Sequence, residues 1–340
     1  MSTKCITAVK ALSFAVITFC FLHDVCNAQT PSESNSLRLV ATIPLPGVSG
    51  RIDHLAFDQV HQTLFAAALG NNTVEVVDLI NKNVIHTIRN LSEPQGVAFI
   101  PESGHLFVAN GGNGECDIFD ASSFRKVNSI QLSGDADNVR YDSSDNKIYV
   151  GYGDGGIAII DASNYKQVAD IKLSGHPESF QLDKTDKKIY ANVPDKKQIE
   201  VVDLKLNAVT DRWIMSDASS NFPMSLDEAN HVIFIGCRHP AMLIAIDMRT
   251  GKTITTIATD NDVDDLFYDK TSNQIYMSCG GGYLNIIKYT ETNTFVSNEK
   301  IQTHSGARTS LFIPELNRLI VASPSGFNRD AALLIYNVKK

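Results

Sequence analysis

Short runs of apolar and β-branched residues recur along this chain, and many of them end in two apolar residues followed by an aspartate. Five of these aspartates are spaced 42, 41, 42 and 44 residues apart, at Asp78, Asp120, Asp161, Asp203 and Asp247. The same ending returns without the acid at Ile287-Lys288 and Ile335-Tyr336. Such regular spacing indicates an internal structural repeat.

A second set of markers runs in phase with these aspartates: Asp58, Pro101, Asp142, Asp183, Asp227, Asp269 and Pro314. About seven residues after each marker comes a bulky residue that we interpret as core: Phe65, Phe107, Tyr149, Tyr190, Phe234, Tyr276 and Leu319. Each unit reads as four short strands separated by Gly, Asn, Asp and Pro, with no sustained helical period. Four strands in about 43 residues is the length of a propeller blade. The sequence therefore predicts an all-β, seven-bladed β-propeller over residues 37–340.

The seventh unit lacks its outer strand, because only four residues follow Tyr336. Residues 40–47 match the outer-strand residues 168–175 in register. We therefore expect the N-terminal strand, residues 39–47, to pair with residues 331–337 and to close the ring. Closure removes the exposed edges that an open series of sheets would leave.

The first 28 residues have the pattern of a secretory signal. Lys4 and Lys10 precede an uncharged run at 11–22, and Cys26-Asn27-Ala28 places small residues where signal peptidase cleaves. The apolar run is too short to span a bilayer. We predict a signal peptide at 1–28, a flexible tail at 29–36, and a soluble, monomeric protein exported to the periplasm or secreted, without membrane insertion. An uncleaved N-terminal anchor is the alternative.

After residue 28 the chain holds three cysteines, Cys116, Cys237 and Cys279. Their odd number and wide scatter do not form a disulfide framework, and no zinc-ligand spacing is present. We interpret all three as small buried apolar side chains.

Several strand-like runs carry a resemblance to a known family. They are Leu106-Phe107-Val108-Ala109-Asn110, Ile148-Tyr149-Val150-Gly151 and Ile189-Tyr190-Ala191-Asn192, each followed by an apolar-apolar-Asp strand. They resemble the repeats of the YVTN-repeat (YncE-like) seven-bladed propellers of the bacterial periplasm and cell surface. The resemblance covers essentially all of the chain after residue 28, and it implies the architecture rather than a particular activity.

The charge balance excludes one class of partner. The chain has 30 Lys and Arg residues against 38 Asp and Glu residues, a formal net charge of −8. Binding to polyphosphate requires a basic surface. Some members of the family that these repeats resemble are labelled DNA-binding. Because this chain is acidic, we expect no nucleic acid partner here.

Equivalent residues of seven blades should form rings around a central channel. Four of the seven residues that lie five positions before the second marker are acidic. The seven residues are Asp53, Gly96, Asp137, Glu178, Phe222, Asp264 and Thr309. The seven residues that lie three positions before the second marker are all apolar, and we interpret them as blade core: Leu55, Ala98, Val139, Phe180, Met224, Leu266 and Leu311. The acids predict a carboxylate-lined ligand site, because clustered acids repel each other and need a compensating partner. The alternative is that they cap loops by accepting backbone N–H hydrogen bonds.

Other polar residues are predicted to lie at the same end of the channel. The full candidate ligand-binding set is Arg51, Asp53, His54, Asp137, Asn138, His176, Glu178, Arg238, His239, Asp264, His304 and Arg308. If a divalent metal ion binds there, the candidate ligands are Asp53, Asn138, Glu178 and Asp264. His54 and His176 are the candidate catalytic residues, because imidazole can move a proton near neutral pH.

Two classes of function remain open. The first is a non-enzymatic module that binds a small molecule, a glycan or an exported protein. The second is a metal-assisted hydrolase or lyase, resembling propeller lactonases and streptogramin lyases. No nucleophile elbow is visible, and Trp213 is the only tryptophan, so the repeated tryptophan motif of quinoprotein dehydrogenases is absent. The binding module is the favoured interpretation.

Overall fold

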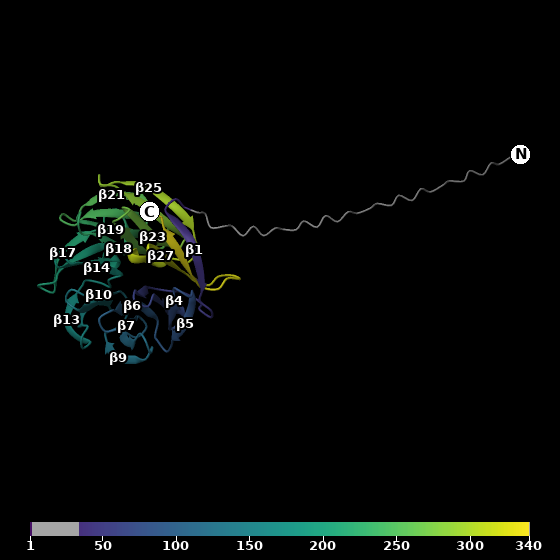
Figure 1. The fold of residues 1–340 in the computed structure, drawn as a ribbon. Helices are drawn as coiled ribbons and strands as arrows, with labels where there is room; N and C mark the ends of the chain where they lie inside the picture. The colour runs from purple at the N-terminus through teal and green to yellow at the C-terminus, as the bar shows by residue number, and fades with distance from the viewer. Residues whose placement is uncertain (2–33, 340) are drawn as a thin grey trace. The chain divides into compact units, whose positions relative to one another are not determined.

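The computed structural model of this protein describes Met1 and residues 34–339 (Figure 1). Residues 34–339 hold seven four-stranded antiparallel sheets arranged as blades around a centre. The predicted all-β, seven-bladed propeller is therefore confirmed. Residues 2–28 of the predicted signal peptide lie outside the described residues, which contain no helix long and apolar enough to cross a membrane.

The first six blades each use four consecutive strands, with the first strand innermost. Blade one has β2 (Leu55–Asp58), β3 (Thr63–Ala68), β4 (Thr73–Asp78) and β5 (Asn83–Ile88); blade two has β6 (Pro94–Ile100), β7 (His105–Asn110), β8 (Glu115–Asp120) and β9 (Lys126–Gln131). Blade three has β10 (Val139–Asp142), β11 (Lys147–Tyr152), β12 (Gly156–Asp161) and β13 (Lys166–Lys172); blade four has β14 (Ser179–Asp183), β15 (Lys188–Val193), β16 (Gln198–Asp203) and β17 (Ala208–Ile214). Blade five has β18 (Ser219–Asp227), β19 (Val232–His239), β20 (Ala241–Asp247) and β21 (Thr253–Ala258); blade six has β22 (Val263–Asp269), β23 (Gln274–Cys279), β24 (Tyr283–Tyr289) and β25 (Phe295–Gln302). The described residues also contain three short 3₁₀ turns, η1 (Leu69–Asn71), η2 (Pro194–Lys196) and η3 (Pro314–Leu316).

The seventh blade joins the two ends of the propeller. It combines β26 (Thr309–Ile313), β27 (Arg318–Ser323) and β28 (Ala332–Val338) with β1 (Leu37–Pro44) as the outer strand. Leu37 lies opposite Val338 and Ile43 opposite Leu333, so the predicted closure by the N-terminal strand is confirmed. The paired segment starts two residues earlier than predicted.

The described part of the predicted flexible tail is held in place. The Ser34 hydroxyl accepts the backbone N–H of Leu37 at 2.7 Å, and the backbone N–H of Asn35 donates to Glu299 Oε1 at 2.6 Å. The Ser36 hydroxyl also donates to Glu299, at 2.9 Å. The contacts with Glu299 tie residues 35 and 36 to the outer strand of blade six.

Most of the repeated aspartates close turns between strands. Asp78 Oδ1 accepts the backbone N–H groups of Ile80 and Asn81 at 2.7 and 2.9 Å. Equivalent bonds to the residues two or three positions later are made by Asp58, Asp120, Asp142, Asp161, Asp183, Asp203, Asp227, Asp247 and Asp269. A large share of the negative charge is thus structural, since an ionised Asp is well suited to this turn.

The bulky residues of the second strands form the core, as predicted. All seven are at most 1% exposed: Phe65, Phe107, Tyr149, Tyr190, Phe234, Tyr276 and Leu319. The three cysteines are buried and free. The second core prediction is also confirmed for six of its seven residues, which are at most 9% exposed: Leu55, Ala98, Val139, Phe180, Met224 and Leu266. Leu311 is only partly buried. Five of the seven also line the central channel: Leu55, Val139, Met224, Leu266 and Leu311. Each sheet runs outward from the centre, so the innermost strand presents its edge to the channel and residues of both faces border it (Figure 1).

Candidate functional site

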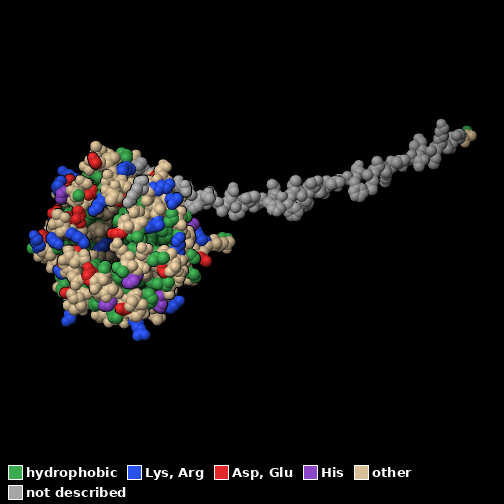
Figure 2. Space-filling view, in the orientation of Figure 1, with side chains coloured by type: hydrophobic (Ala, Val, Ile, Leu, Met, Phe, Trp, Pro, Cys, Tyr) green, Lys and Arg blue, Asp and Glu red, His purple; other side chains and the backbone are tan. Residues whose placement is uncertain are grey.

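A cavity of about 160 Å³ lies where the chain enters the innermost strands, and we call it the mouth cavity. It is lined by Arg51, Gln95, Asp135, Asp137, His176, Glu178, Phe222, Arg238, Asp264 and Arg308. Figure 2 shows the propeller hollowed at its centre, with acidic and basic side chains gathered around the hollow. The predicted rings therefore do bring charged residues of different blades to one place.

Asp264 is the centre of an ion-pair cluster in this cavity. Its Oδ1 lies 2.6 Å from Nη2 of Arg238, and its Oδ2 lies 3.0 Å from Nε of Arg308 and 3.5 Å from Nη2 of Arg51. Only 10% of the Asp264 side chain is exposed. The guanidinium of Arg238 also lies over the ring of Phe222, 3.7 Å from its centroid. Three arginines thus converge on one carboxylate.

Asp137 lies between two imidazoles. Its Oδ1 is 3.7 Å from Nε2 of His54, and its Oδ2 is 4.0 Å from Nε2 of His176. Burial alone would raise the pKa of Asp137, but His176, His54 and Arg51 together hold it below its ordinary value. Its Oδ1 is buried and has no hydrogen-bond partner among the described residues. A buried oxygen of this kind marks a place where a ligand group or water can bind.

His176 is held as a cation. Its Nδ1 lies 2.7 Å from the carbonyl oxygen of Gly153, which can only accept, so Nδ1 carries the proton. Burial lowers the pKa of His176, but the interactions with Asp137 and the Gly153 carbonyl outweigh it and raise the pKa to about 9. At neutral pH the imidazole is therefore charged and cannot act as a general base.

Two further carboxyl groups lie in this region. Asp53 is 1% exposed and pairs with Nη2 of Arg51 at 2.9 Å, and burial raises its pKa. The Glu178 carboxyl makes no hydrogen bond or ion pair with any described residue. Burial, followed by repulsion from Asp137, raises the pKa of Glu178 to about 7. Arginines and His176 lie among these acids, so the lining of the mouth cavity has mixed charge.

The mouth acids do not cap loops. Among the described residues, the side chains of Asp53, Asp137, Glu178 and Asp264 accept no backbone N–H hydrogen bond. The capping role belongs to the turn aspartates described above.

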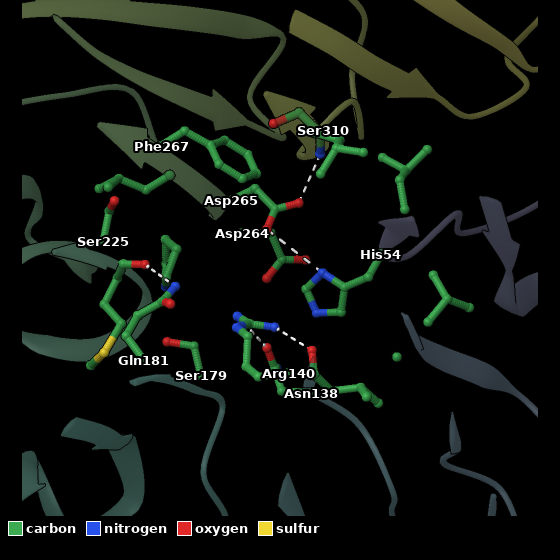
Figure 3. A pocket seen from close by; sticks show the side chains of 18 residues that line it. His54, Asn138, Arg140, Ser179, Gln181, Ser225, Asp264, Asp265, Phe267 and Ser310 are labelled. Atoms are coloured by element: carbon green, nitrogen blue, oxygen red, sulfur yellow. Dashed lines mark hydrogen bonds and ion pairs between the residues drawn. The ribbon is translucent and has the colours of Figure 1, made fainter. Parts of the chain in front are cut away.

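A second cavity of about 360 Å³ lies further along the channel, and we call it the chamber (Figure 3). Asp264 lines both cavities. The chamber also contains Asp265, whose Oδ1 is 3.6 Å from Nδ1 of His54 and whose Oδ2 accepts the backbone N–H of Ser310 at 2.7 Å. Burial raises the pKa of Asp265 to about 7.

The predicted site residues divide between these cavities. The mouth cavity is lined by Arg51, Asp137, His176, Glu178, Arg238, Asp264 and Arg308. The chamber is lined by His54, Asn138 and again Asp264. Asp53 contacts Arg51 and His54. His239 and His304 line neither cavity: Nδ1 of His239 faces the Ser220 hydroxyl at 3.1 Å, and that of His304 faces the Ser323 hydroxyl at 2.9 Å.

Three of the four candidate metal ligands, Asp53, Asn138 and Asp264, contact guanidinium groups. Asp264 is paired with guanidinium groups on both oxygens, and the Asn138 side-chain oxygen accepts Nη2 of Arg140 at 3.1 Å. Residues 34–339 contain no group of three or more His, Cys, Asp or Glu side chains arranged to hold a metal ion. Glu178, in contrast, has no guanidinium partner among the described residues, and binding of a divalent cation by this set stays a prediction.

The sequence rings missed most of the chamber. All seven residues that lie four positions before the second marker line it: His54, Val97, Asn138, Ser179, Pro223, Asp265 and Ser310. Arg140, Gln181, Ser225 and Phe267, two positions before the marker, line it as well. Scoring every offset for polar residues would have found the first of these rings, in which five of the seven residues are polar. The rings were missed because the sequence interpretation followed residues on only one face of each strand.

Comparison with known proteins supports the fold alone. No protein-family model and no curated protein sequence matches this chain. A chain of the crystal structure of a mitotic checkpoint complex aligns with a TM-score of 0.76 at 15% identity, covering 97% of this chain and 100% of that one. A chain of Kuenenia stuttgartiensis hydrazine synthase aligns with a TM-score of 0.72 at 14% identity, covering 85% and 98%. At these identities the shared feature is the propeller architecture.

Proposed function

We propose that this chain is a ligand-binding propeller of the YVTN-repeat type, whose mouth cavity binds a neutral, hydroxyl-rich small molecule such as a sugar or the end of a glycan. One observation carries the proposal: guanidinium donors and carboxyl acceptors from different blades line a single small cavity, and their charges largely offset each other. A hydroxyl group both donates and accepts, so a polyol can use both kinds of partner without introducing an uncompensated charge.

Two acceptors remain for such a ligand. The Glu178 carboxyl has no partner among the described residues, and Asp137 Oδ1 is buried without a hydrogen bond. Leaving a buried acceptor unsatisfied costs about 1–3 kcal/mol, which a bound hydroxyl would recover. The mouth is thus better matched to a ligand that donates hydroxyl groups than to a ligand that carries a carboxylate.

The experiment is a glycan array followed by calorimetric titration of the sugars retained. Replacement Glu178→Ala should abolish or weaken binding about tenfold, the effect of losing one hydrogen bond to a charged acceptor. Glu291→Ala, in an exposed turn between β24 and β25, is the matched control and should bind like the parent. Retention of a protein partner without any sugar would instead favour the exported-protein alternative and overturn this proposal.

We further propose that the chain is exported. The support is the pattern of residues 1–28 and the resemblance of the repeats to exported propellers. Expression of the full chain in a bacterium, followed by N-terminal sequencing of the protein from the periplasm or medium, should give Gln29 as the first residue. Recovery of a chain that begins at Met1 in the cytoplasm would rule out cleavage after Ala28.

A further inference from the structure

The chamber holds one guanidinium, that of Arg140, that makes no direct contact with a carboxylate, although Asp265 and Asp137 lie near enough to favour its charge. Nη1 of Arg140 donates to the carbonyl of Val139 at 2.9 Å, and Nη2 donates to the Asn138 side chain at 3.1 Å, so both partners are neutral. No described carboxylate forms an ion pair with it. The three mouth arginines, in contrast, all pair with Asp264.

Arg140 is positioned to bind a ligand in the chamber. It stands on β10, and its guanidinium faces the space that His54 and Asp264 also face (Figure 3). Its contact with the Phe180 ring, at 5.6 Å from the centroid, helps to orient it. A guanidinium has five N–H donors in a planar fork, and only two hydrogen bonds are made here. The remaining donors are free for an anion.

The rest of the chamber fits an apolar body. Met224, Leu266 and Leu311 form part of its wall. The nearby polar groups are already engaged: the Ser179 hydroxyl donates to the Phe222 carbonyl at 2.6 Å, and the Gln181 amide nitrogen donates to the Met224 carbonyl at 2.9 Å. The chamber volume of about 360 Å³ lies within the usual range of small-molecule pockets, about 300–1,000 Å³.

We propose that the chamber binds a small organic acid, with its carboxylate on Arg140 and its apolar body against Met224, Leu266 and Leu311. A carboxylate matches the guanidinium fork and can accept two parallel N–H bonds. This site is separate from the sugar site proposed for the mouth, where the arginines already have a carboxylate partner. The chamber acids do not exclude an anion, because Asp264 is neutralised by arginines and Asp265 readily holds a proton.

The site should bind its ligand better in mild acid. The charged and titratable groups around Asp265 are His54 at 3.6 Å, the acids Asp264 and Asp53, and Arg140. An anion on Arg140 favours the protonated form of Asp265. Since the pKa of Asp265 is about 7, affinity should fall about threefold to tenfold between pH 6 and pH 8, as the linked proton is lost.

The test is calorimetric titration of the protein with benzoate at pH 6, with benzyl alcohol as the uncharged analogue. One benzoate should bind, and benzyl alcohol should bind at least about tenfold more weakly. Arg140→Met, which keeps the side-chain length without the charge, should weaken benzoate binding about tenfold or more. Arg249→Met, in the exposed turn between β20 and β21, is the control and should change neither affinity.

Comparison of the two ligands on the parent protein needs no variant, so the test stands even if Arg140→Met fails to fold. Absence of benzoate binding at millimolar concentration, equal affinity for benzyl alcohol, or full benzoate affinity in a folded Arg140→Met protein would each overturn the proposal. The sugar site is measured separately through Glu178→Ala, so the two proposals can fail independently.

Discussion

Arg238 and Asp264 form the shortest ion pair of the mouth cavity, with Nη2 of the arginine 2.6 Å from Oδ1 of the carboxylate. The arginine is 17% exposed and the aspartate 10% exposed, so water screens the pair little. The two residues come from neighbouring blades, on β19 and β22. This pair therefore links blade five to blade six as well as shaping the site.

Replacement Asp264→Asn should lower the free energy of unfolding by about 3–5 kcal/mol, because it leaves Arg238 and Arg308 without their buried partner. Asp262→Asn is the matched control. Asp262 also pairs with Arg308, but its side chain is 37% exposed, and we expect a loss below about 1 kcal/mol. Urea denaturation at pH 7 measures both, and equal losses would contradict the central role of Asp264.

Glu178→Gln should change how stability depends on pH. The pKa of Glu178 is about 7 in the folded protein against an ordinary 4.5, so between these values the folded state keeps a proton that the unfolded chain releases. Stability contributed by this group therefore falls as pH rises through that window. The glutamine variant has no such proton and should gain about 1–3 kcal/mol over the parent between pH 4 and pH 8.

Urea denaturation at pH 4, 6 and 8 measures this difference. Glu291→Gln, in the exposed turn after β24, should give a curve parallel to that of the parent. A parallel curve for Glu178→Gln as well would show that its carboxyl is not desolvated in the folded state.

His176 should remain protonated at pH 8, because its pKa is raised to about 9. A group with a raised pKa stabilises the fold fully below its ordinary value of 6.5, and this contribution is lost as pH rises through about 9. Asp137→Asn removes the paired carboxylate, so the His176 pKa should fall. A nuclear magnetic resonance titration of the imidazole nitrogens measures the His176 pKa in the parent and in Asp137→Asn. An unchanged His176 titration curve in the variant would refute the pairing.

Ile43→Ala should lower the free energy of unfolding by about 2–5 kcal/mol, the cost of removing a buried isoleucine side chain. Ile43 is 1% exposed and belongs to the core cluster shared by the first and last blades. Its neighbour Thr42 is exposed, and Thr42→Ala should change stability by less than about 0.5 kcal/mol. If Ile43→Ala melted like the parent, closure by β1 would not contribute to stability.

The sequence by itself determined the architecture. Repeat spacing near 43 residues, turn aspartates such as Asp78 and bulky core residues such as Phe65 are local signals, since a turn and a strand depend on few neighbours. The missing outer strand of the last blade and its match at residues 40–47 also predicted the closure. Each of these features repeats, so chance agreement at one position matters little.

Only the tertiary structure decided which residues meet. Arg140 did not stand out in the sequence, because its value as a site residue comes from having no ion-pair partner among the described residues. Arg238 reaches Asp264 from another blade. Leu266 is a core residue, as its place in the strand predicts, and it also borders the channel because the innermost strand stands edge-on to it. Periodicity fixes which strand a residue occupies, but its partners depend on how seven sheets are placed around one axis.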